Sequence, residues 1–141
     1  MAATRTATAH WEGNLFQGSG SVTFESSGLG TYDVTWASRT EDPAGRTSPE
    51  ELISGALSAC YCMALSNVLD KGGTPPTALD VRAETTFQPG EGVTGIHLVV
   101  RGSVPGMSQE DFVSAAETGK ENCPVSQALR ATPITLDAAL A

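Results

Sequence analysis

Apolar and polar residues alternate with a two-residue period in the first forty residues of the chain, as in strands with one buried face. The apolar positions of this pattern are Val22, Phe24, Tyr32, Val34 and Trp36. Turn-forming residues at 26–30 lie between the two runs, which predicts an antiparallel hairpin or meander. An earlier short strand is expected over residues 7–11, and residues 41–47 are expected to form a loop.

A long helix is the clearest element that the sequence predicts. Ser48 can cap its start, Pro49 suits its first position, and Glu51 completes a capping box three residues after Ser48. Gly72-Gly73 should end the helix at about Lys71. Such a helix would be about 35 Å long. The rest of so small a chain can cover little of it, so a second copy of the chain is expected to do so.

The middle of this helix approaches the composition of a membrane span. Residues 52–69 are 18 consecutive uncharged residues, and a span needs roughly 18–20. The small or polar residues that interrupt the run are Ser54, Gly55, Ser58, Cys60, Cys62, Ser66 and Asn67. We therefore expect a helix of a soluble protein, buried on most sides, and no membrane association.

The second half of the chain continues with strands and helices. The predicted elements are a strand at 79–87, a strand at 93–104, a helix from Ser108 to about Asn122, a short helix at 125–130 and a strand at 134–140. Pro124 breaks the chain between the two helices and can open the second of them. This order predicts an α+β fold in one domain, residues 1–141, without internal repeats or linkers.

Charge and composition narrow the function classes. Sixteen acidic and eight basic side chains give a net charge of −8, with no basic cluster that could bind a phosphate backbone, so no nucleic-acid partner is expected. Charged residues make up only 17% of the chain, which favours an obligate oligomer. The polar N-terminus lacks the apolar run of a secretory signal, so a cytoplasmic location is expected.

Three cysteines are the sharpest chemical feature. Cys60 and Cys62 lie two residues apart in the predicted helix, with side chains about 200° apart, so they cannot share a metal or a bridge. Cys123 precedes Pro124 at the start of the short helix, where backbone N–H groups lower the pKa of a thiol. Three inert, buried thiols are the alternative. The spacing of the two histidines, His10 and His97, matches no metal motif, so no metal is expected.

Several separated motifs make the chain similar to a known family. They are His10-Trp11-Glu12-Gly13, Ser38-Arg39-Thr40-Glu41, Ser48-Pro49-Glu50-Glu51-Leu52-Ile53, Ala59-Cys60-Tyr61-Cys62-Met63-Ala64-Leu65 and Cys123-Pro124-Val125-Ser126-Gln127. In this order, over about residues 9–137, they resemble the osmotically inducible and organic hydroperoxide resistance family of thiol peroxidases (OsmC/Ohr). The expectation of Arg39 in a strand before the loop matches the osmotically inducible branch. Ser48 stands where the family often has Asn, and Cys62 where its close branch has Ser.

The resemblance implies both a fold and an activity. The fold is α+β, with antiparallel sheets wrapped around a long central helix in an intertwined two-fold dimer. Cys60 becomes the cysteine that attacks peroxide and Cys123 the resolving one, while Arg39 and Glu50 become the polar pair that activates Cys60. An external dithiol, of lipoyl type in relatives, reduces the resulting Cys60–Cys123 disulfide. No cofactor is implied, and the expected role is antioxidant, in a stress response.

This chemistry agrees with the residues. A thiolate attacks the O–O bond, so a nearby cation such as Arg39 must favour ionisation, and Glu50 can hold the guanidinium in place. Cys123 then condenses with the Cys60 sulfenic acid before over-oxidation proceeds. Apolar neighbours, among them Leu57, would favour organic over inorganic hydroperoxides. Tyr61 either shapes this pocket or packs elsewhere.

The helix spacing adds a prediction about assembly. Glu50 and Cys60 are ten residues apart on one helix, about 15 Å along its axis. Glu50 cannot reach Cys60 of its own chain over that length, so Glu50 and Arg39 are expected to come from a second subunit. This predicts a homodimer with antiparallel central helices and two sites at the interface. A non-catalytic redox sensor or small-molecule binder on the same scaffold is the alternative function.

Overall fold

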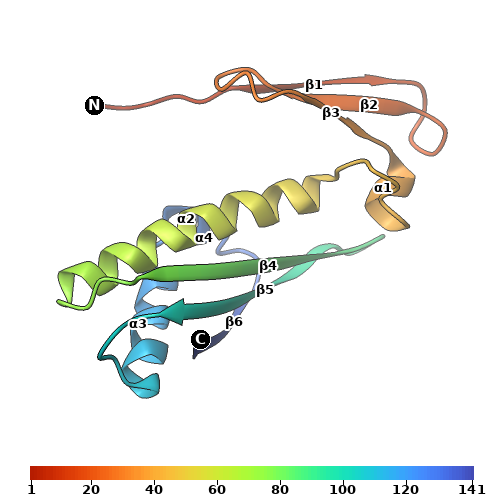
Figure 1. The fold of residues 1–141 in the computed structure, drawn as a ribbon. Helices are drawn as coiled ribbons and strands as arrows, with labels where there is room; N and C mark the ends of the chain where they lie inside the picture. The colour runs from red at the N-terminus through yellow and green to blue at the C-terminus, as the bar shows by residue number, and fades with distance from the viewer. The chain divides into compact units, whose positions relative to one another are not determined.

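The computed structural model describes residues 1–141, and its elements follow the predicted order (Figure 1). They are β1 (Ala7–Glu12), β2 (Ser19–Phe24), β3 (Thr31–Val34), α1 (Trp36–Thr40), α2 (Pro49–Lys71), β4 (Ala78–Gln88), β5 (Gly92–Ser103), α3 (Gln109–Asn122), α4 (Pro124–Ala128) and β6 (Ile134–Leu140). They divide between two compact units, which we call unit 1 (residues 1–52) and unit 2 (residues 53–141). The single domain 1–141 stays a prediction.

Unit 1 contains an antiparallel sheet in the order β1-β2-β3. The residue after β3 begins a short helix instead of continuing the strand: Thr35 and Ser38 form a capping box, with each side chain bonded to the other's backbone N–H. The expectation of a strand through Trp36 to Arg39 was therefore wrong. The reciprocal cap at Thr35 and Ser38 outweighs the alternating pattern that Trp36 continues.

Unit 2 contains a mixed sheet in the order β4-β5-β6. β4 and β5 are antiparallel, as expected of a hairpin, but β5 and β6 are parallel. The expectation of purely antiparallel sheets therefore needs correction. The chain crosses from β5 to β6 through α3 and α4, and a helical crossover of this kind returns the chain in a parallel direction.

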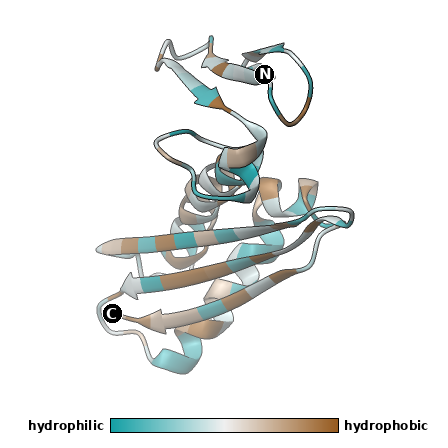
Figure 2. Ribbon diagram, turned by 90° about the vertical axis from the view of Figure 1, so that its right-hand side faces the viewer, coloured by the Kyte–Doolittle hydropathy of each residue, from teal (hydrophilic) through white to brown (hydrophobic).

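The core of unit 2 lies between its sheet and its helices. Apolar side chains alternate with polar ones along β4 and β5, and the helices lie on one face of the sheet (Figure 2). The largest fully buried side chains are Tyr61, Phe112, Leu57, Leu65, Leu69, Leu98, Val100 and Cys123. Gly102 is needed here, because a Cβ at this position would lie 2.6 Å from ring atoms of Phe112. One of the two candidate cysteines thus belongs to the hydrophobic core.

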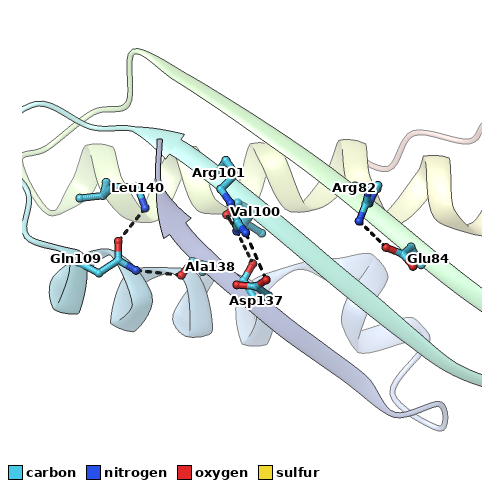
Figure 3. A network of polar contacts seen from close by, with 8 residues as sticks. All are labelled: Arg82, Glu84, Val100, Arg101, Gln109, Asp137, Ala138 and Leu140. Carbon is cyan, nitrogen blue, oxygen red and sulfur yellow. Dashed lines mark hydrogen bonds and ion pairs between the residues drawn. The ribbon is translucent and has the colours of Figure 1, made fainter.

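The strands of unit 2 also carry an outward polar network (Figure 3). Arg82 pairs with Glu84 on β4, at 2.9 Å, and Arg101 of β5 pairs with Asp137 of β6, at 3.3 Å. Gln109, at the start of α3, accepts the N–H of Leu140 and donates to the carbonyl of Ala138. The Gln109 side chain therefore takes the place of a neighbouring strand along the end of β6.

The predicted long helix is present with the predicted bounds. The N–H of Glu51 donates to the hydroxyl of Ser48 at 3.2 Å, and the Glu51 carboxylate accepts the hydroxyl of Thr47. By length and composition α2 could cross a membrane, but the central helix of a soluble core passes the same test. Four α2 side chains between Leu57 and Leu69 belong to the core of unit 2, which favours the second interpretation.

Candidate active site

Arg39 and Glu50 form an ion pair within unit 1. The guanidinium Nε donates to both carboxylate oxygens, at 2.9 and 3.1 Å, and Nη2 donates to Oε1 at 2.8 Å. Glu50 is only 6% exposed, so its charge depends on this partner. Such a fork fixes the plane of the guanidinium as well as its position. The two residues that the family resemblance pairs are therefore paired, while their catalytic role stays a prediction.

Short-range contacts hold this ion pair in place. The guanidinium carbon of Arg39 lies 5.9 Å from the centroid of the Trp36 ring, in a cation–π arrangement. The buried hydroxyl of Ser38 donates to the carbonyls of Thr35 and Thr47, each at 2.9 Å, which joins α1 to the residues just before α2. Arg39 thus lies on a capped helix, α1, and not on a strand.

Cys60 and Cys123 meet within unit 2. Cys60 lies half-buried on α2, and Cys123 is fully buried at the junction of α3 and α4. The two thiols lie close enough for each to shift the pKa of the other: Cys123 raises the pKa of Cys60, and Cys60 lowers the pKa of Cys123. Cys60 and Cys123 are 63 positions apart in the sequence. The packing of α2, β5 and α3 around one core brings them together. The structure therefore brings together the two sulfurs that the sequence singled out.

The surroundings of Cys123 favour its thiolate. Burial raises the pKa of the Cys123 thiol, whereas the N–H and hydroxyl groups of Ser126 lower it. The thiol of Cys60 and the N–H of Val125 lower it further, so the pKa of Cys123 lies below its ordinary value. Cys123 makes no conventional side-chain cap to α4, but these N–H groups still stabilise a negative charge on its sulfur.

Cys60 has the opposite shift. Burial raises the pKa of Cys60, the N–H of Val125 lowers it, and the hydrogen bond and charge of Cys123 raise it, so that it lies above its ordinary value. Two adjacent sulfurs share one negative charge, because the first charge opposes the second. The opposite directions of the two shifts favour the first negative charge on Cys123. A cation that favours a Cys60 thiolate has to come from outside this pair.

Ser126 is a site residue to which the sequence analysis assigned no role. Its hydroxyl oxygen is buried and has no hydrogen-bond partner, and the nearby Ser126 side chain lowers the pKa of Cys123. The signal that could have found it is spacing, since Ser126 is three residues after the N-cap Cys123. Side chains at the N-cap and three residues later meet each other in capping boxes.

The remaining candidates lie apart from this pair. Cys62 is half-buried on another side of α2 and lines a surface cavity of about 680 Å³. Burial and the charge of Asp80 raise the pKa of the Cys62 thiol. Tyr61 packs in the core and donates its hydroxyl to the carbonyl of Ala116 at 2.8 Å. Of the two interpretations of Tyr61, packing is the one that the structure favours.

The histidines belong to neither group of site residues. His10 lies 3.3 Å from Glu12 in unit 1, and the Nδ1 of His97 lies 2.6 Å from the hydroxyl of Thr135 in unit 2. No group of three or more His, Cys, Asp or Glu side chains is arranged to hold a metal ion. The candidate residues therefore form two separate groups, a pair of sulfurs in unit 2 and an ion pair in unit 1.

Comparisons with known proteins identify the relatives of this chain. Residues 41–137 match the OsmC-like protein family. The chain is 40% identical over 132 residues to peroxiredoxin OsmC of Escherichia coli, covering 92% of this chain and 91% of that protein. This similarity is consistent with a soluble protein.

Solved structures share the fold over nearly the whole chain. An organic hydroperoxide resistance protein OsmC of Legionella pneumophila has a TM-score of 0.77 at 23% identity, over 99% of this chain and 98% of that one. An organic hydroperoxide resistance protein of Elizabethkingia anophelis has a TM-score of 0.76 at 22% identity, over 100% and 99%. Together with the sequence match, they show that this chain belongs to the OsmC-like protein family.

Proposed function

We propose that this chain is a cysteine-based thiol peroxidase that reduces organic hydroperoxides to alcohols through a Cys60 sulfenic acid and a Cys60–Cys123 disulfide. The observation that carries the proposal is the proximity of a half-buried thiol on α2, packed against the core of unit 2, to a buried thiol at the start of α4 in that core. The names of the relatives, a peroxiredoxin and organic hydroperoxide resistance proteins, support a peroxide as substrate.

The first step consumes the peroxide. The Cys60 thiolate attacks the terminal oxygen of the hydroperoxide, the S–O bond forms and the O–O bond breaks. The alkoxide leaves with the electron pair and takes a proton to become the alcohol. Cys60 is thereby oxidised to the sulfenic acid, and the hydroperoxide is reduced.

The second step closes a disulfide, which a donor then opens. The Cys123 thiolate attacks the sulfenic sulfur of Cys60, and hydroxide leaves and becomes water with one proton. An external dithiol, for which a lipoyl-type compound is our candidate, attacks the disulfide and is itself oxidised to a disulfide. Both cysteines return to the reduced state, and no metal or other cofactor takes part.

A second copy of the chain supplies the activating cation in this proposal. Burial and the neighbouring Cys123 raise the pKa of Cys60, so a nearby positive charge is needed to favour its thiolate. The Arg39–Glu50 fork is already assembled in unit 1, and ten helical residues separate Glu50 from Cys60 of the same chain. We therefore assign the Arg39–Glu50 pair to the partner's site in a homodimer with two interfacial sites.

The chemistry also bears on the substrate and the setting. Leu57 is buried and Met63 is exposed on the same helix as Cys60, and apolar side chains near the sulfur favour alkyl or lipid hydroperoxides. Removal of such peroxides makes the protein antioxidant, acting in a stress response. A cytoplasmic location belongs to the same proposal.

A single-turnover assay tests the function. Reduced protein is mixed with one equivalent of cumene hydroperoxide, and the loss of peroxide is followed over time. Wild type is expected to consume one equivalent and to lose two hydrogens in a non-reducing intact-mass measurement, mapped to a Cys60–Cys123 bridge. Cys60→Ser should lower the rate by about 100-fold or more, because the nucleophile is gone.

Cys62→Ser is the matched control. It removes a thiol two positions away on the same helix and should keep the rate within about twofold of wild type, since Cys62 faces another side of α2. Equal, low consumption by wild type and Cys60→Ser would end the peroxidase proposal in favour of a sensor or a binding protein.

A further inference from the structure

The motif at residues 10–13, which the proposed chemistry does not use, leads into the turn between β1 and β2. The indole Nε1 of Trp11 donates to the carbonyl of Gly13 at 3.1 Å, and Gly13 has a φ of +90°, which residues with a Cβ rarely adopt. In the same turn, the side-chain oxygen of Asn14 accepts the N–H of Gln17 at 2.8 Å. These contacts give the turn a defined shape.

This turn carries Phe16 to the ring of Trp36. The centroids of the two rings lie 5.8 Å apart and their planes cross at 89°, the edge-on arrangement that aromatic pairs favour. Phe16 is 74% exposed, so it does not serve as a core residue of unit 1. Its contact instead restricts the positions that the Trp36 side chain can take.

Trp36 in turn contacts the cation of unit 1. The guanidinium carbon of Arg39 lies over the Trp36 ring, 5.9 Å from its centroid, while the carboxylate of Glu50 accepts from Nε and Nη2 of the same guanidinium. The side chain of Arg39 is 29% exposed, and long side chains at such positions have many rotamers open to them. The fork and the ring together constrain the position of the charge more than the fork alone.

We propose that Trp36 is a positioning residue for the activating cation, and that Phe16 supports it from the turn between β1 and β2. The inference rests on the proposed peroxidase function, in which Arg39 favours the thiolate of the partner's Cys60. A cation that is already in place stabilises a negative charge without reorganisation, whereas a mobile one does not. Trp36 contacts neither the peroxide nor the sulfur in this proposal and acts only through Arg39.

Single-turnover rates with cumene hydroperoxide give the first test. Trp36→Leu removes the aromatic face and keeps an apolar side chain, so peroxide attack at neutral pH should be about 3–10-fold slower. Trp36→Phe keeps an aromatic face and should stay within about twofold of wild type. Tyr32→Leu is the matched control, since this exposed aromatic residue of unit 1 pairs with Phe24 and not with Trp36. It should leave the rate unchanged.

The pH profile of the attack rate separates positioning from a merely structural role. A nearby cation lowers the pKa of a thiol, so a displaced guanidinium should move the midpoint of the profile to higher pH in Trp36→Leu. A structural role would lower the rate at every pH without moving the midpoint. Trp36→Leu should also cause no further slowing in an Arg39→Ala background, because it acts only through that cation.

Phe16→Ala keeps the inference testable if Trp36→Leu fails to fold. Phe16 is largely exposed, so its truncation should leave the fold intact, which circular dichroism checks. The attack rate should fall by about twofold, with a midpoint moved in the same direction as in Trp36→Leu. An unchanged rate and an unchanged midpoint in this variant would remove Phe16 from the proposal.

An NMR measurement needs no peroxide. The ring current of an indole displaces the signals of protons that lie over its face, so the Nε proton of Arg39 should resonate away from its ordinary position in the reduced protein. Trp36→Leu should return this signal to that position, and Trp36→Phe should keep part of the displacement. Arg39→Lys removes the signal and thereby assigns it.

The outcomes separate this inference from the proposed function. An unmoved midpoint in a folded Trp36→Leu would overturn the positioning role, as would equal slowing with and without Arg39. A wild type that consumes no peroxide would overturn the peroxidase proposal and, with it, the catalytic part of this inference. The Arg39 signal would then still report whether Trp36 holds the guanidinium.

Discussion

Unit 1 and unit 2 differ in what they bury. The fully buried apolar side chains of the chain, from Leu57 to Cys123, all belong to unit 2. In unit 1 the buried residues are polar, Ser38 and Glu50. None of its aromatic side chains is fully buried. Phe16 is 74% exposed, and its ring meets the ring of Trp36 edge-on. Unit 2 therefore has its own hydrophobic core, whereas unit 1 has a buried ion pair and no such core.

This difference indicates that the two units have different roles in stability and in the proposed activity. Burial of apolar surface contributes about 25 cal/mol per Å², so unit 2 has its own source of stability and can hold two sulfurs in fixed geometry. A three-stranded sheet with neither face buried needs further surface to cover it. A second copy would provide that surface and bring the Arg39–Glu50 pair to a Cys60, which agrees with the proposed dimer.

The largest effect is expected in the core of unit 2. Leu65→Ala should destabilise the protein by about 2–5 kcal/mol, because it leaves a cavity where α2 packs closely against Gly119 of α3. Denaturant unfolding of the reduced protein measures the loss. Val113→Ala, a truncation on the exposed side of α3, should cost less than about 0.5 kcal/mol. Equal losses in the two variants would show that unit 2 lacks the core described for it.

The ion pair of unit 1 should control activity more than stability. Arg39→Ala should slow peroxide attack by about 100-fold, because Cys60 then lacks its activating cation. Glu50→Gln, which keeps the shape but removes the charge that orients Arg39, should slow it by about tenfold. Single-turnover rates of the reduced proteins measure both effects, and a wild-type rate in Arg39→Ala would exclude the proposed role.

An experiment with a mixture of two inactive variants tests which subunit provides Arg39. Arg39→Ala and Cys60→Ser are unfolded, mixed in equal amounts and refolded together. If Arg39 acts on the partner's Cys60, half of the dimers are mixed and one of their two sites is intact, which restores about a quarter of wild-type activity. If Arg39 acts within its own chain, the mixture should be as inactive as its components.

The exposed face of α2 offers a smaller test of assembly. The apolar side chain of Met63 on α2 is 72% exposed. The proposed dimer covers this side chain. Met63→Glu would bury a charge there, so the dimer should dissociate at least about tenfold more readily in sedimentation experiments. Val113→Glu places the same charge on α3 and should leave dissociation unchanged. A stable, fully active monomer of wild type would exclude the dimer altogether.

The smallest expected effect is the pH dependence of stability. The pKa of Cys123 is lowered in the folded chain, so its stabilisation is present above the ordinary thiol pKa of about 8.5 and is lost as the pH falls through the lowered value. The raised pKa values of Cys60 and Cys62 act in reverse and favour the folded state below that pH. Reduced wild type should therefore become more stable relative to Cys123→Ser as the pH rises toward about 8.5. Thermal unfolding measures the difference, and a flat profile would contradict the thiolate at Cys123.

Local elements were predictable where short-range signals agreed. The cap at Ser48, the proline at Pro49 and the glycines after Lys71 all favour the same bounds of α2, and the structure has them. The prediction was wrong at α1, where the alternation through Trp36 suggested a strand. A capping box between neighbouring residues was a competing local signal there, and only the folded chain showed which signal prevails.

The candidate site was predictable as a set of residues but not as an electrostatic arrangement. The motifs named Arg39, Glu50, Cys60 and Cys123, and the structure pairs them two by two. The spacing rules allowed a lowered pKa at Cys123, which the structure has. They could not show that Cys123 raises the pKa of Cys60, because that depends on how α2 packs against the start of α4.

The sequence by itself determined the order of strands and helices, the apolar faces and the membership in the OsmC-like family, because these depend on side-chain pattern and on motifs along the chain. Only the tertiary structure decided the parallel pairing of β6, the meeting of two thiols distant in sequence and the full burial of one of them, Cys123. The physical reason is that burial and hydrogen bonding between distant segments set the pKa of a thiol, and both arise only when the core assembles.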